Sequence, residues 1–142
     1  MEQKKLDEIL RMHKMWLNGE EEGKRADLRA DLQSTDLQST DLQGADLRDA
    51  NLRGVDLDYS CWPLWCGSLY VKVDLRIAAQ LAYHFCRLDC DDPDYIAARN
   101  AIIHFANEFH RVEECGWLEP KEVKQDERIH LSGTCWPHLR NR

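Results

Sequence analysis

Cysteine and histidine are the residues of this sequence with the widest chemical scope, because both ligate metals and together they can form a nucleophile and its base. The chain contains 6 of each. Cys86 and Cys90 have i, i+4 spacing, which can bring two sulfur atoms together on one helix face. His110 cannot complete a site with them, because it lies roughly 25 Å along the next predicted helix at 1.5 Å per residue. We therefore expect no zinc site at Cys86 and Cys90.

A second set of potential ligands falls at the opposite end of the same predicted helical hairpin. Its members are Cys61, Cys66, His110 and Cys115. Four such ligands could hold one structural Zn²⁺, which would stabilise a small irregular lobe, and Cys135 and His138 are substitutes for members of the set. The spacing contains no CxxC pair, so free, partly buried thiols and disulfides are alternatives to a metal. Structural zinc is the one cofactor that the sequence suggests.

Motifs of the common enzyme classes are missing from the sequence. It contains no glycine-rich phosphate loop, no GxSxG elbow and no HExxH motif. Cys115 and His110 could be paired as nucleophile and base, but the sequence identifies no oxyanion hole to serve them. The aspartates of residues 89–94 lack the spacing of an EF-hand loop, and capping of the following helix explains most of them. We therefore predict that the protein is not an enzyme.

The composition of the chain limits the kinds of partner that the protein is expected to bind. The chain has 142 residues and a net charge of −7, so a basic surface that binds nucleic acid directly is not expected. No apolar run approaches the roughly 20 residues of a membrane span, and the charged N-terminus resembles neither a signal nor a transit peptide. These features predict a cytoplasmic protein that does not associate with membranes. In the reducing cytosol, thiols and metal sites are commoner than disulfides.

A period of five residues dominates the first half of the chain. From Ala30 the sequence reads ADLQS TDLQS TDLQG ADLRD ANLRG VDLDY, with leucine at every fifth position from Leu32 to Leu57. Each leucine follows Asp or Asn, which in turn follows a small residue. This period fits neither a helix nor a flat strand, and it indicates a coil that turns one corner per repeat. Leucine and the small residue should point inward.

This A(D/N)LXX pattern resembles the pentapeptide-repeat proteins. The lead-in, which includes Trp16-Leu17 and residues 23–28, is similar to small members of the family encoded by bacteriophages. The resemblance implies a right-handed quadrilateral β-helix with four repeats per coil, here about one and a half coils. With its flanking helices, this gives an α+β fold class.

The flanking sequence supplies covers for the two apolar ends of such a short coil. Residues 1–25 should form an N-terminal capping helix, over residues 3–17, followed by a turn, and residues 26–60 the β-helix itself. Residues 61–119 combine a Cys/Trp-rich junction, which could contain short strands, with an antiparallel helical hairpin. The apolar positions of its first helix are Leu75, Ala78, Leu81, Ala82, Phe85 and Leu88. Residues 120–142 form a charged C-terminal tail.

Acidic residues ring the predicted coil, with eight Asp against three Arg over residues 26–60. Some long pentapeptide-repeat proteins mimic DNA, but one and a half coils with a rise of about 4.8 Å each are too short for that. A short acidic patch could still bind a partner through Asp36, Asp41 and Asp46. The alternative is a solvated Asp position that the repeat itself prefers. Trp62 and Trp65 at the junction could supply an aromatic hot spot.

Three functions are compatible with these features. The first, implied by the phage resemblance, is an accessory protein that binds and inhibits a bacterial host protein. Its target would be a defence component, as in anti-CRISPR or anti-restriction activity, or a nucleic-acid-handling enzyme. The second is a protein that sequesters a small molecule in a pocket between coil and helical lobe, lined by Trp62, Trp65, Tyr70 and Tyr83. The third is a structural module that self-associates through one end of the coil, for example as a homodimer.

Overall fold

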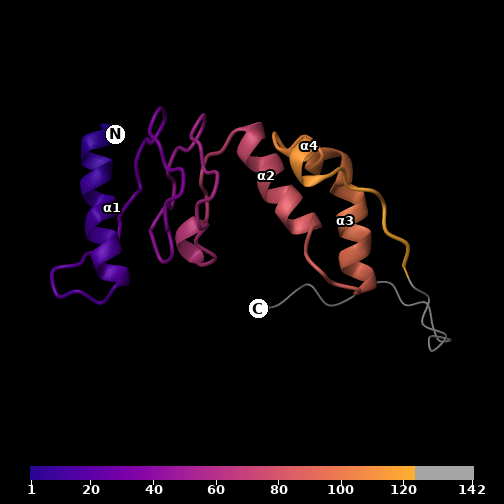
Figure 1. Cartoon of the computed structure of the whole chain (residues 1–142), viewed down its shortest axis with the longest axis horizontal. Coiled ribbons are helices and arrows are strands. Elements are labelled where there is room, and N and C mark those ends of the chain that lie inside the picture. The colour runs from indigo at the N-terminus through magenta and orange to yellow at the C-terminus, as the bar shows by residue number, and fades with distance from the viewer. Residues whose placement is uncertain (124–142) are drawn as a thin grey trace.

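The computed structural model describes residues 1–123 and arranges them in three layers along one axis (Figure 1). Helix α1 (Gln3–Leu17) forms the first layer, and residues 26–72, which we call the repeat coil, form the second. The short 3-10 helix η1 (Cys66–Ser68) lies near the end of the repeat coil. The third layer holds α2 (Leu75–Cys86), α3 (Pro93–Ala106) and α4 (Val112–Cys115).

Each repeat of the coil folds as one tight turn. The leucine carbonyl accepts a hydrogen bond from the N–H three residues later, as from Thr35 to Leu32 (3.1 Å) and from Val55 to Leu52 (3.1 Å). The second residue after each leucine has a positive φ, which is the geometry of a type II turn. These left-handed residues are Ser34, Ser39, Gly44, Asp49, Gly54 and Tyr59. The period of five in the sequence is therefore a period of turns.

Successive coils stack through single pairs of residues about twenty positions apart. The parallel bridges join Asp31 to Asn51, Asp36 to Asp56 and Asp41 to Cys61, so four repeats complete one circuit. The inward leucines from Leu28 to Leu52 are completely buried, together with Ala45, Ala50 and Val55. This ladder of leucines is the core of the repeat coil.

The predicted β-helix, and with it the α+β class, is wrong in this structure. Residues 1–123 contain no β-strand and no sheet, and they are helical or irregular apart from isolated bridges. The turn supplies the reason, because it uses four of the five positions in each repeat. One position per repeat is left to pair with the next coil, whereas a strand needs consecutive paired residues. The strands expected at the junction are also missing, and η1 takes their place.

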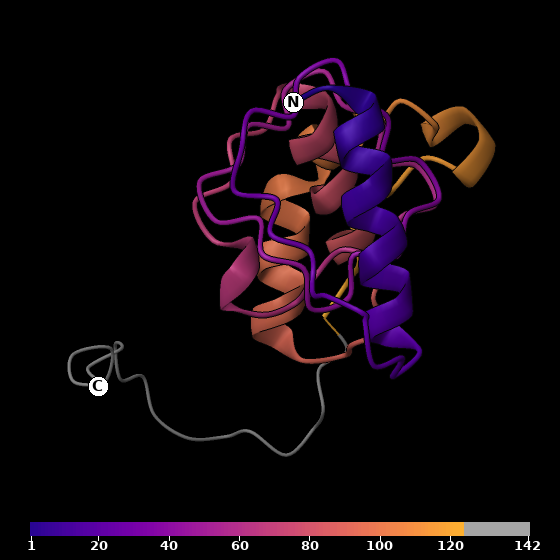
Figure 2. The same ribbon diagram turned by 90° about the vertical axis from the view of Figure 1, so that its left-hand side faces the viewer.

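Helices cover both ends of the repeat coil. Leu6 of α1 and Ile77 of α2 are buried in the leucine core from opposite sides. Gln3 fixes the edge of α1, because its Oε1 accepts the N–H of Asp36 (2.9 Å). The view along the axis shows α1 lying across the nearer end of the coil (Figure 2). The two covers keep the ends of the leucine ladder out of water.

A second, smaller core joins α2 to α3 and α4. It consists of Tyr83, Cys86, Ile103, Ala106, Phe109, Val112 and Leu118. Both helices begin at an aspartate cap, because the side chain of Asp74 accepts the N–H of Ile77 and that of Asp92 accepts the N–H of Asp94, with Pro93 following. Helix α3 ends at Ala106, and α4 follows separately. Within residues 1–123, no helix has the length and apolar character needed to cross a membrane.

Candidate functional site

An apolar groove lies between the repeat coil and α2. Its volume is about 460 Å³. The coil contributes Leu57, Ser60, Trp62 and Leu64, and α2 with the residues just after it contributes side chains from Ile77 to Leu88. The exposed fraction of Leu64 is 95%, so the groove is lined by hydrophobic surface that the chain leaves in water.

The groove exists because α2 is attached to the coil mainly at its beginning. The carboxylate of Asp74 accepts the N–H of Gly54 (2.6 Å), and Ile77 enters the leucine core. One turn later Gln80 donates to Asp58 (2.9 Å). Beyond Gln80 the helix diverges from the coil, as the ribbon shows (Figure 1), and the groove is lined along this part of α2.

A cluster around Asp58 holds the helical lobe in this position. Asp58 lies within 3.0 Å of Nε2 of His110, and Arg76 reaches both Asp58 (3.9 Å) and Asp56 (3.6 Å). Burial opposes the charge on Asp58, but the hydrogen bonds from His110 and Gln80 and the charge of Arg76 keep its pKa below the usual value. Asp58 therefore stays ionised and ties segments that lie 52 residues apart.

Of the side chains predicted to line a pocket between coil and helical lobe, only Trp62 lines this groove, and the sequence analysis did not show which apolar positions of α2 would stay exposed. Leu75, Leu81 and Leu88 are exposed, and Phe85 is half-buried. The face of α2 that packs on α3 instead carries Ala79, Tyr83 and Cys86. Helix α2 thus has two apolar faces, and only one of them is covered within residues 1–123. Two overlapping apolar stripes on one helix were the signal in the sequence.

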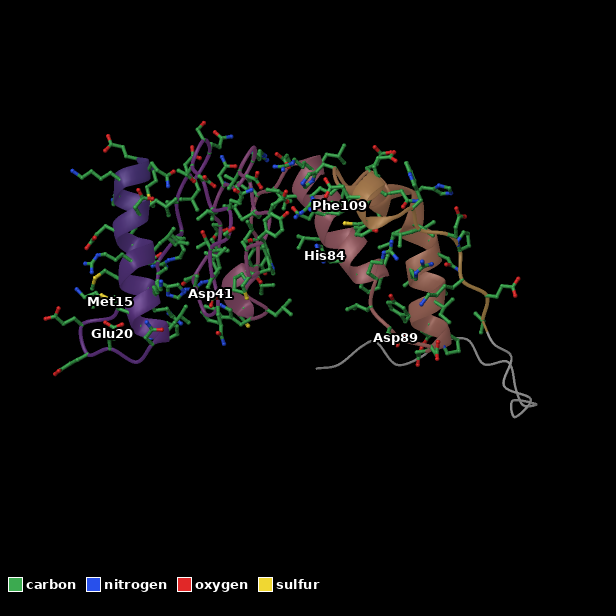
Figure 3. The ribbon with its side chains drawn as sticks, in the orientation of Figure 1. Met15, Glu20, Asp41, His84, Asp89 and Phe109 are labelled. Atoms are coloured by element: carbon green, nitrogen blue, oxygen red, sulfur yellow. The ribbon has the colours of Figure 1, made fainter. Side chains whose placement is uncertain are left out.

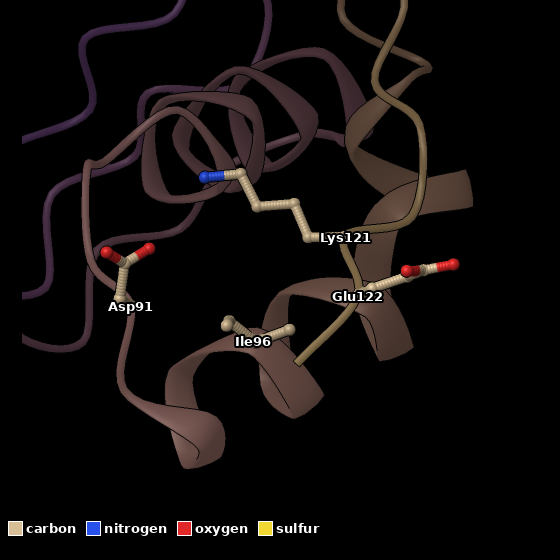
Figure 4. A pocket seen from close by; sticks show the side chains of 4 residues that line it. All are labelled: Asp91, Ile96, Lys121 and Glu122. Atoms are coloured by element: carbon tan, nitrogen blue, oxygen red, sulfur yellow. The ribbon is translucent and has the colours of Figure 1, made fainter. Parts of the chain in front are cut away.

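Four aspartates lie at the end of the groove where α2 stops. Asp89, Asp91 and Asp92 are exposed in the turn between α2 and α3, directly after the groove residue Leu88, and the exposed Asp94 lies in the first turn of α3. The side-chain view places Asp89 at this lower end, beyond His84 (Figure 3). A smaller hollow of about 280 Å³ lies on the other side of this turn, lined by Asp91, Ile96, Lys121 and Glu122 (Figure 4).

The aspartates predicted to bind a partner have a structural role in the repeat turns. Oδ1 of Asp36 accepts the N–H of Gln38 (2.9 Å), and Oδ1 of Asp41 accepts the N–H of Gln43 (2.9 Å). The same contact recurs at the other repeats, including the one in which Asn replaces Asp. Both Asp36 and Asp41 are nevertheless exposed. The repeat thus has its own reason for an Asx residue at this position.

Asp46 differs from the other two because it is only 4% exposed. Arg48 pairs with its carboxylate at 2.6 Å, and Arg29 lies 3.7 Å away. The hydrogen bond from Arg48 outweighs desolvation and lowers the pKa of Asp46. Its charge is therefore matched inside the protein and is poorly placed to meet a partner.

The two junction tryptophans lie in different environments. Trp62 lines the groove. Trp65 instead donates from Nε1 to the carbonyl of Ala45 (2.9 Å), and the guanidinium of Arg25 lies 5.0 Å from its ring centroid. Gly67 packs against the Trp65 ring so closely that a Cβ there would lie 2.1 Å from it. Tyr70 and Tyr83, which were also predicted to line a pocket here, are not among the groove residues.

The predicted zinc ligands do not gather. Cys61, Cys66 and Cys115 are exposed free thiols, and His110 is engaged with Asp58. Nowhere in residues 1–123 do three or more His, Cys, Asp or Glu side chains group so that they could hold a metal. Cys86 is buried, and burial raises the pKa of its thiol. Cys135 and His138 lie outside the described residues.

Comparison with known proteins identifies one part of the chain. Residues 25–61 match the family model described as pentapeptide repeats, in 8 copies. No curated protein and no solved structure matches the chain. The match bears on the repeat and not on a phage origin, and it agrees with the turn period seen in the coil. Residues 25–61 are therefore a run of pentapeptide repeats.

Proposed function

We propose that this chain is a non-enzymatic protein-binding module that docks on its partner through the groove between the repeat coil and α2. The more specific form of the proposal is a phage-type accessory protein that binds and inhibits a bacterial host protein. Its target would be a defence component or a nucleic-acid-handling enzyme. The specific form is supported by the similarity of the lead-in and repeats to small phage-encoded proteins.

The observation that supports docking is the uncovered apolar face of α2. Leu81 and Leu88 face the groove from this helix, and Trp62 and Leu64 face it from the coil. Exposed large apolar side chains in one concave patch are typical of protein-binding surfaces, where such side chains become anchors. By contrast, the polar side chains of Asp58 and His110 already bind one another.

The structure supports two other functions, small-molecule binding and self-association, less well than docking. The volume of the groove would accommodate a small molecule, since ligand sites span about 300–1,000 Å³. However, Leu64 is almost fully exposed at its edge, whereas small-molecule sites bury most of their ligand. Self-association would need an uncovered end of the coil. Among residues 1–123 both ends are covered, one by α1 and the other by α2.

The test is partner recovery with matched variants. We expect the tagged full-length chain to recover a specific bacterial protein, and Leu64→Asp to lose it because a charge would be placed in the contact. Leu75→Asp is the control, since Leu75 is also exposed but lies outside the groove. The recovered protein should lose activity when the wild-type chain is added. Equal recovery by both variants would refute docking through the groove, and full activity of the recovered protein would refute inhibition.

A further inference from the structure

The groove has the length of a short helix. Its lining along the chain runs from Ile77 to Leu88, which at 1.5 Å per residue spans roughly 16 Å. That distance equals about three helical turns, enough for apolar anchors at positions i, i+4 and i+7 of a partner helix. The volume of about 460 Å³ is suited to a few large side chains rather than to a whole domain surface.

The charge at the end of the groove where α2 stops is mainly negative. The exposed residues Asp89, Asp91, Asp92 and Asp94, in the turn before α3 and in its first turn, form no ion pair with any other residue in the range 1–123. Two cations lie close to this turn, Arg87 just before it in the chain and Lys121 in the small hollow that Asp91 lines, so the four carboxylates outnumber them. Arg87 donates to the hydroxyl of Tyr83 (2.7 Å) and to the carbonyl of Cys115 (2.6 Å), while Arg76 pairs with Asp56. A negative field therefore remains at this end of an apolar surface.

We propose that the groove binds an amphipathic helical segment of another protein, with two or three large apolar side chains flanked by Lys or Arg. The apolar side chains fill the space between Leu64 and the exposed stripe of α2, and the cations face the Asp89–Asp94 turn. This inference rests on the proposed function and specifies the chemistry of the partner. Apolar contacts supply most of the affinity, while the charges select basic over acidic segments and speed association.

The test uses two synthetic helical peptides with the same leucine pattern, one with lysine and one with glutamate at the polar positions. Titration calorimetry of the full-length chain should show binding of the Leu–Lys peptide and at least tenfold weaker binding of the Leu–Glu peptide. Leu64→Ser should weaken the Leu–Lys complex at least fivefold, and Leu75→Ser should leave it unchanged. Asp89→Asn with Asp91→Asn should weaken it about threefold at low salt, whereas Asp49→Asn, in the coil, should have no effect.

Several results would overturn the inference. Equal affinity for both peptides would refute the basic partner and leave the proposed docking function standing. Binding that ignores Leu64→Ser would place the peptide outside the groove. A dimer in sedimentation that Leu64→Ser dissociates would make a second copy the occupant. If Leu64→Ser exposed residues 124–142 to limited proteolysis, the occupant would be the chain's own C-terminal segment. Failure of both peptides to bind would refute the inference, and partner recovery would then decide the proposed function separately.

Discussion

Substitution of Asp36 separates the structural role of the repeat aspartates from an electrostatic one. The only hydrogen bond of its side chain is from the N–H of Gln38, at 2.9 Å, within the residues described. Asp36→Ala removes this acceptor but leaves intact the backbone N–H that donates to Gln3 and the bridge to Asp56. Asp36→Asn keeps an oxygen acceptor at the same position and removes only the charge, as the natural Asn51 repeat does.

Two free-energy terms oppose each other at this position. Loss of one partly solvated hydrogen bond costs about 0.5–1.5 kcal/mol. Removal of the charge relieves repulsion from Asp56 on the next coil, which is worth about 0.2–0.5 kcal/mol after screening by salt. We therefore expect Asp36→Ala to lower the free energy of unfolding by about 0.5–1 kcal/mol. Asp36→Asn should leave it unchanged or raise it by a few tenths of a kcal/mol.

Urea unfolding followed by circular dichroism measures this difference, and thermal unfolding should show Asp36→Ala lower in Tm by roughly 2–5 °C. Gln33→Ala is the control, because Gln33 is exposed in an equivalent turn. Wild-type stability of Asp36→Ala would refute the argument that the carboxylate is retained for its hydrogen bond. A loss of stability in Asp36→Asn as large as in Asp36→Ala would instead assign the effect to charge.

Three further outcomes test the fold. Gly54→Ala should lower the free energy of unfolding by about 1 kcal/mol in urea titrations. The cost comes from the backbone, because the φ of Gly54 is +74° and no atom lies close to the added Cβ. An unchanged free energy of unfolding would contradict the left-handed turn. Gly67→Ala should lower the free energy of unfolding by more than Gly54→Ala does, because the added Cβ displaces the Trp65 indole. Iodide should then quench the fluorescence of Trp65 more strongly, and unchanged quenching would contradict the packing. Burial lowers the pKa of His13 from 6.5, despite the opposing effects of Asp41 and the Gln43 backbone, so the fold favours its neutral form. The contribution of neutral His13 to the free energy of unfolding is complete above pH 6.5, and it is lost as the pH falls towards the lower pKa that His13 has in the folded state. Urea titrations at pH 7.5 and 5.5 should therefore show a smaller pH-dependent loss in His13→Gln than in the wild type, and equal losses would refute the role of His13.

The repeat segment was the part of the fold that the sequence described best, since the period of five places each leucine of the repeats inside. Sequence also indicated that aspartates of residues 89–94 cap the following helix, and Asp92 does so, because a cap depends on neighbouring residues only. The type of backbone pairing was not deducible from the period, because a turn that uses four residues of five leaves isolated bridges in place of strands. The predicted metal set failed to gather for a related reason: its members are distant in the chain, and His110 is bound by Asp58.

Local periodicity thus determined what each segment does alone: the turns, the inward leucines and the helix starts. The tertiary structure decided which of two apolar stripes of α2 is covered, because α3 and the coil compete for the same helix. It buried Ala79, Tyr83 and Cys86 against one neighbour and left Leu81 and Leu88 facing the groove. Spacing along a helix specifies which residues share a face, but burial depends on what lies opposite that face, and only the folded chain supplies it.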